Sequence, residues 1–107
     1  MPIPISGKAL ADAIQSSAIP QVIDVRRQPV FDASQRMIVN AVWRNPEEIE
    51  DWIFSLDAGR SVIVYCVHGH QVSQGCAERL EQAGFHSNYL EGGFEQWTGE
   101  NYPTITK

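Results

Sequence analysis

The stretch Val62-Ile-Val-Tyr-Cys-Val-His-Gly-His-Gln-Val-Ser-Gln-Gly-Cys76 decides the fold class of this 107-residue chain. Residues 61–65 form a short, mostly apolar run that is typical of a strand buried on both faces. A helix is expected to begin five or six residues after Cys66. The apolar face of that helix carries Val72, Cys76, Leu80 and Ala83. A buried strand that leads through a loop into an amphipathic helix is typical of an α/β protein.

Strand-like and helix-like segments alternate along the rest of the chain. Further strands are expected at residues 21–25, 37–42 and 87–90, and further helices at residues 7–15, from residue 46 to about residue 57, and at residues 94–97. Strands separated by helices imply a parallel sheet, here of roughly five strands, with helices on both faces. The length predicts one domain that spans residues 1–107.

Composition limits the classes of binding partner and the cell compartment that are expected for this protein. The formal net charge is −5 and the eight Lys and Arg residues are scattered, which argues against nucleic acid or an anionic membrane surface as a partner. The first residues have no signal-peptide pattern, and the longest apolar run is too short to span a membrane. The chain has two cysteines without a metal-type spacing. A cytoplasmic, reduced protein is therefore expected.

Cys66 is the candidate reactive residue. It follows the central strand, and ligands of open parallel sheets bind beyond the carboxyl ends of the strands. Gly69 allows the loop to curl so that its N–H groups, together with the N-terminus of the next helix, point at the sulfur. Such surroundings favour the thiolate, so the pKa of Cys66 should fall below its usual value of about 8.5. The loop therefore predicts a nucleophile at neutral pH.

Simpler interpretations apply to several of these residues. A cysteine at a strand end is commonly a small core residue, and Cys76 on an apolar helix face is expected to pack in the core. His68 and His70 are expected to be loop residues more often than acid–base groups. No metal site is predicted from Cys66 and these histidines, because no carboxylate stands near them in sequence.

Four segments, in their order and spacing, resemble the single-domain rhodanese family of sulfurtransferases. They are Ile5-Ser-Gly-Lys-Ala-Leu10, Val22-Ile-Asp-Val-Arg26, Tyr65-Cys-Val-His-Gly-His-Gln-Val-Ser73 and Leu90-Glu-Gly-Gly-Phe-Glu-Gln-Trp97. They match the family's opening strand and helix, its D-V-R strand, its active-site loop and its closing GG-x-x-x-W. The resemblance covers nearly all of the chain and implies a rhodanese-like fold.

The resemblance also implies a mechanism and a set of site residues. Cys66 would take a sulfane sulfur from a donor such as thiosulfate, become a persulfide, and pass the sulfur to a thiol or cyanide. The backbone amides from Val67 to Gln71 would hold the persulfide, with Asp24 and Arg26 as supporting residues. The implied substrate-binding residues are Val67, His68, Gly69, His70, Gln71 and Val72. No cofactor and no metal are implied; the expected partners are small sulfur compounds, acceptor thiols or a partner protein.

The chain departs from the family at two places. The family commonly has an arginine five positions after the cysteine, where this chain has Gln71, so the loop has no fixed positive charge unless His70 is protonated. Residues 37–41 stand where the family has H-I-P-G-A, so that connection should bend differently. Arg36 and Arg44 are candidates for a cation near the site and equally for solvated surface charges.

Of three other functions, the sequence argues against the first and leaves the other two open. A phosphatase of the cell-cycle type uses the same fold but needs a loop arginine to stabilise the phosphoryl oxygens, which Gln71 and Val72 do not provide. A non-catalytic rhodanese-like module would bind a partner protein or sense an anion, and its cysteine would alkylate slowly. A persulfide carrier would form the persulfide but turn over poorly with small molecules.

Overall fold

A computed structural model describes residues 2–107 of the chain. In chain order these residues form β1 (Pro4–Ile5), α1 (Gly7–Ile14), β2 (Gln21–Asp24), α2 (Gln28–Ala33), β3 (Arg36–Ile38), β4 (Ala41–Trp43), η1 (Pro46–Glu48), α3 (Ile49–Trp52), η2 (Ile53–Ser55), β5 (Val62–Tyr65), α4 (Gln71–Gln82), β6 (Ser87–Leu90), α5 (Gly93–Gly99) and β7 (Thr104–Thr106). The elements η1 and η2 are single turns of 3₁₀ helix that flank α3.

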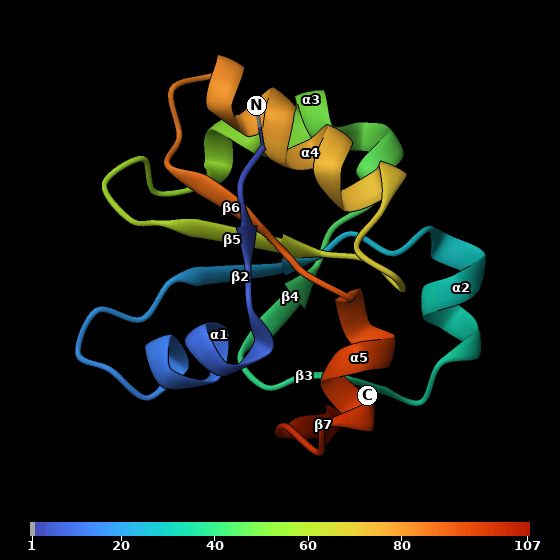
Figure 1. The fold of residues 1–107 in the computed structure, drawn as a ribbon. Coiled ribbons are helices and arrows are strands. Elements are labelled where there is room, and N and C mark those ends of the chain that lie inside the picture. Colours follow the sequence, from blue (N-terminus) through green and yellow to red (C-terminus); the bar gives the residue numbers. More distant parts are fainter. Residues whose placement is uncertain (1) are drawn as a thin grey trace.

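The main sheet contains five strands in the order β1-β6-β5-β2-β4, and all neighbouring pairs are parallel (Figure 1). Strand β5 lies in the middle, and all four of its residues are buried. The register of β2 on β5 places Asp24 beside Tyr65, so both strands end at the same edge of the sheet. The predicted five-stranded parallel sheet and the α/β fold class are confirmed.

Helices cover both faces of this sheet (Figure 1). Because side chains alternate along a strand, Val62 and Val64 of β5 face one core, while Ile63 and Tyr65 face the other. The first core is completed by α3 and α4, which contribute Trp52, Cys76, Ala77 and Leu80. The second is completed by α1 and α5, which contribute Leu10, Ile14 and Trp97. Burial on both faces explains why β5 is an uninterrupted apolar run.

The helix starts follow local capping chemistry. The Ser6 side chain accepts a hydrogen bond from the Ala9 N–H at 3.1 Å and caps α1, as serine at the N-cap position of a helix commonly does. Asn45 accepts from the Glu47 N–H at 3.0 Å and begins the turn that contains Pro46. The expected single helix from residue 46 is instead divided into η1, α3 and η2. The Trp52 indole, which donates to the Asn45 carbonyl at 2.8 Å, packs this compact unit against the core.

The prediction of one strand at residues 37–42 is wrong, because this segment is divided between two separate strands. Asn40 adopts a left-handed conformation, with φ at 68°, and ends the extended run. Strand β3 on one side pairs antiparallel with β7, and β4 on the other side joins the main sheet beside β2. Asparagine tolerates this conformation better than most residues, which is why the turn forms without a glycine.

The fold brings the ends of β2 and β5 together at one edge, where the chain leaves for α2 and α4 (Figure 1). This edge carries Cys66, the residue immediately after β5. Among residues 2–107 no helix is long and apolar enough to cross a membrane.

Candidate functional site

Cys66 lies at the floor of a small cavity at the carboxyl edge of the sheet. Its residue exposure is only 7%. The cavity has a volume of about 210 Å³ and is lined by Arg26, Arg27, Val30, Cys66, Val67, His68, His70, Gln71 and Val72. The structure therefore gathers the predicted cysteine and most of the predicted substrate-binding residues around one opening. Gly69, also predicted, is buried and does not line the cavity.

Hydrogen-bond donors surround the sulfur. The Cys66 thiol donates to Ser73 Oγ at 3.2 Å, and on ionisation that hydroxyl can reverse and donate to the thiolate. Burial by itself raises the pKa of Cys66, because it disfavours the charged form. The Ser73 hydroxyl and the backbone N–H groups of Ser73, His70 and Gly69 outweigh burial and hold the pKa below the usual value of a thiol. The site thus favours a thiolate.

The loop is held from the other side by the start of α5. The Phe94 N–H donates to the Cys66 carbonyl at 2.8 Å, and the Glu95 N–H donates to the Val67 carbonyl at 3.0 Å. Because a trans peptide points its carbonyl and its N–H in opposite directions, this contact turns the adjoining loop amides away from α5. The GG-x-x-x-W segment therefore shapes the cysteine loop.

Gly69 is required at its position for two reasons. Its φ of +72° is a conformation that residues with a side chain rarely adopt. A Cβ atom there would lie 2.7 Å from the Leu90 carbonyl oxygen and 2.9 Å from the Gly92 nitrogen, both of which are backbone atoms that cannot move aside. The loop can pass this close to the turn before α5 only if residue 69 is glycine.

The two histidines lie at the mouth of the cavity and are exposed. His68 Nδ1 is 3.3 Å from Glu95 Oε2, and the two imidazole rings are 6.1 Å apart. No group of three or more His, Cys, Asp or Glu side chains within residues 2–107 is placed to hold a metal ion.

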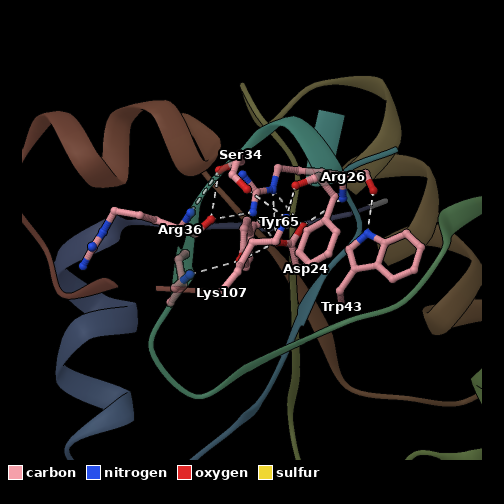
Figure 2. Close-up of polar contacts among 9 residues, drawn as sticks. Asp24, Arg26, Ser34, Arg36, Trp43, Tyr65 and Lys107 are labelled. Carbon is pink, nitrogen blue, oxygen red and sulfur yellow. Dashed lines mark hydrogen bonds and ion pairs between the residues drawn. The ribbon is translucent and has the colours of Figure 1, made fainter. Parts of the chain in front are cut away.

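At the same edge of the sheet, Asp24 and Arg26, which lines the cavity, form a buried pair (Figure 2). Arg26 Nη2 donates to Asp24 Oδ2 at 2.7 Å and to the Arg36 carbonyl at 3.0 Å. The Tyr65 hydroxyl donates to Asp24 at 2.8 Å and accepts from the Ile38 N–H at 3.1 Å. This network connects β2, β5 and β3, and the Arg26 guanidinium also lies 4.3 Å from the centre of the Phe94 ring in α5. The pair thus joins three strands at the edge of the sheet that carries Cys66.

The second cysteine has a different environment. Cys76 lies in the core on the α4 face of the sheet, as predicted. Burial and, to a smaller extent, the nearby Cys66 raise the pKa of its thiol to about 12. Cys76 therefore remains a protonated core thiol at neutral pH.

Two residues near the sulfur were not predicted. Ser73 is fully buried in the first turn of α4, and serine is too common in helices for the sequence to single it out. Arg27 lines the cavity. The two arginines that the sequence offered as a cation near the site lie elsewhere. Arg36 donates hydrogen bonds to Thr104 and Thr106 on β7, and Arg44 lines another cavity. The register of β2 on β5, which the sequence does not reveal, decides which arginine lies near Cys66.

Ser73→Ala is expected to raise the pKa of Cys66, because it removes the hydroxyl that stabilises the thiolate. Alkylation by iodoacetamide depends on the thiolate, so its rate falls as pH falls through the Cys66 pKa. In the variant this fall should occur at higher pH, and alkylation at pH 7 should slow several-fold. The control is Ser87→Ala, which removes another buried serine, bonded to the Ala77 carbonyl. Coincident pH profiles for the Ser73 variant and the wild type would contradict the assignment.

Comparisons with known proteins agree with this geometry. A family model described as a rhodanese-like domain matches residues 6–100. The chain is 34% identical over 84 residues to the thiosulfate sulfurtransferase GlpE of Coxiella burnetii, an alignment that covers 78% of this chain and 75% of that protein. It is 29% identical over 99 residues to the putative sulfurtransferase YtwF of Bacillus subtilis, which covers 92% and 93% of the two chains.

The fold comparison gives the same result. The crystal structure of a rhodanese-related protein from Thermoplasma volcanium superposes with a TM-score of 0.83 at 26% identity, covering 96% of this chain and 97% of that chain. The resemblance noted in the four sequence segments is thereby confirmed. The chain belongs to the rhodanese-like domain family.

Proposed function

We propose that this protein is a sulfurtransferase that moves a sulfane sulfur from a donor such as thiosulfate to a thiol or cyanide acceptor. The proposal depends above all on one observation. Cys66, at the end of the central strand, has its sulfur among the Ser73 hydroxyl and the N–H groups of Gly69, His70 and Ser73, which lower the pKa of the thiol. The relatives named thiosulfate sulfurtransferase support the same chemistry.

In the first half-reaction the Cys66 thiolate attacks the outer sulfur of thiosulfate. A bond forms between Sγ and that sulfur, the sulfur–sulfur bond of thiosulfate breaks, and sulfite leaves with the bonding electron pair. The product is a Cys66 persulfide anion. The donors that stabilise the thiolate would stabilise this second anion as well.

In the second half-reaction an acceptor thiolate or cyanide attacks the outer sulfur of the persulfide. The bond to Sγ breaks, the electron pair returns to Cys66 as thiolate, and the acceptor leaves as a persulfide or as thiocyanate. A covalent intermediate of this kind predicts ping-pong kinetics. Neither half-reaction requires a cofactor.

Intact-mass spectrometry before and after addition of thiosulfate tests the proposal. The reduced protein should gain the mass of one sulfur atom, and Cys66→Ser should gain none. The matched control is Cys76→Ser, which removes the other thiol and should still gain one sulfur, because Cys76 is a buried thiol whose pKa is about 12.

Two results would contradict the proposal in different ways. Rapid alkylation of Cys66 without sulfur gain would mean that the site holds a thiolate whose donor is not thiosulfate, as in a carrier loaded by another protein. Slow alkylation and no sulfur gain would favour a non-catalytic module that binds a partner.

A further inference from the structure

We propose that Arg27 is the anion-binding residue of this site, which holds the negatively charged end of a small sulfur compound while its sulfur reacts at Cys66. The charged end is a sulfonate-type oxyanion, as in thiosulfate, or the carboxylate of a short acceptor thiol. The proposal deepens the sulfurtransferase assignment above and rests on it for the identity of the reaction.

The sheet register places Arg27 at the cavity that contains Cys66. Val25 follows β2 and its N–H donates to the Tyr65 carbonyl at 2.9 Å, so the chain beyond β2 runs beside the chain that carries Cys66. Arg27 comes two residues later and lines the same cavity of about 210 Å³ as Cys66 and Gln71. Arg27 and Gln71, the loop position that lacks a fixed charge, therefore share one cavity.

The Arg27 guanidinium is available to a ligand. Arg27 is exposed, and within residues 2–107 its side chain donates no hydrogen bond and forms no ion pair; only its backbone carbonyl is used, by the Phe31 N–H at 2.9 Å. An arginine offers several N–H donors in one plane, an arrangement that fits the oxygens of a sulfonate or carboxylate.

The other arginines near this edge are already bound to the protein. Arg26, 2% exposed, donates to Asp24 and to the Arg36 carbonyl. Arg79 is paired with Glu50 at 2.6 Å. Of the arginines that line the Cys66 cavity, Arg27 is thus the one whose side chain is not committed.

The neighbouring cavity limits the size of the ligand. Arg27 and Val72 also line a second cavity of about 260 Å³, which contains Cys76, Arg79 and the acidic Glu47. This second cavity carries the Glu47 carboxylate, which repels a negative charge, and its Arg79 is already paired with Glu50. The arrangement therefore favours a compound whose anionic group lies only a few bonds from its reactive sulfur.

The test compares two alkylating reagents, iodoacetate and iodoacetamide, on Cys66. Both react with the same thiolate, so the ratio of their rates does not depend on the pKa of Cys66 and reports the charge at the mouth of the cavity. Arg27→Ala should lower the iodoacetate-to-iodoacetamide ratio about fivefold, the upper range for an exposed ion pair. Arg27→Lys, which keeps the positive charge, should keep the ratio close to its wild-type value.

A matched control removes a positive charge elsewhere. Arg60 lies just before β5, at the opposite edge of the sheet, where its side chain donates to the Ile19 carbonyl. Arg60→Ala should leave the reagent ratio unchanged. If Arg27→Ala left the iodoacetate-to-iodoacetamide ratio as unchanged as Arg60→Ala does, the proposal would be overturned. This result does not depend on whether the protein transfers sulfur.

Kinetics of the two half-reactions then identify which anion Arg27 holds. If it holds the donor, Arg27→Ala should raise the thiosulfate concentration needed for half-maximal persulfide formation about tenfold, with the limiting rate unchanged. If it holds the acceptor, the variant persulfide should lose its preference for 3-mercaptopropionate over the uncharged 2-mercaptoethanol. Unchanged values in both assays, with normal persulfide formation, would overturn the proposal and leave the sulfurtransferase assignment intact.

Discussion

Asp24→Ala is expected to lower the free energy of unfolding by about 3–5 kcal/mol, the range for breaking a buried ion pair by removing one partner. The variant leaves the Arg26 guanidinium, which is 2% exposed, with its charge uncompensated. It also removes the acceptor of the Tyr65 hydroxyl. Urea unfolding followed by circular dichroism measures the change.

A second carboxylate–arginine pair provides the control for this prediction. Glu50 and Arg79 are as close, at 2.6 Å, but lie at the surface, where water and salt screen the interaction. Glu50→Ala should change stability too little to resolve. Equal losses for the two variants would show that burial does not determine the role of the Asp24–Arg26 pair.

Gly69→Ala is expected to reduce the rate of persulfide formation by about 100-fold or more, the effect of displacing a reacting group by about 1 Å. The added Cβ meets the Leu90 carbonyl oxygen at 2.7 Å, and the residue must also keep a φ of +72°. The loop must therefore move, and the amides of Gly69 and His70 move with it. A stopped-flow assay of the first half-reaction measures this loss.

Gly75 offers the same substitution without the constraint. It lies in α4, has an ordinary helical conformation, and a Cβ there meets nothing within 4 Å. Gly75→Ala should leave the persulfide rate unchanged and stabilise the protein by about 1 kcal/mol, because alanine favours helix over glycine. If the two alanine variants reacted at the same rate, the conformation of Gly69 would not be needed for the site.

Much of the fold follows from apolar periodicity. The buried run of β5 and the apolar face of α4 can be recognised because each pattern extends over several residues and depends only on local geometry. The division of residues 37–42 could not be recognised, since it depends on a left-handed turn at Asn40 and on the pairing of β3 with β7. β7 is only three residues long, and its partner lies far away in sequence.

The site divides in the same way. Cys66 and Gly69 could be predicted because both belong to one continuous loop whose composition is unusual. Ser73 and Arg27 could not, because the importance of each depends on distance to the sulfur in the folded chain. For Ser73 that distance is set by the start of α4, and for Arg27 by the register between β2 and β5.

The hydrogen bonds from Phe94 and Glu95 to the cysteine loop also have a consequence for the order in which the chain is made. Cys66 leaves the ribosome well before the residues that fix its loop. Until α5 has emerged and docked, the Cys66 and Val67 carbonyls lack these two donors, so the start of the cysteine loop is not yet fixed from this side. The residues of α5 are thus the last part of the site to be made, and we expect the loop to reach its final conformation only after they dock.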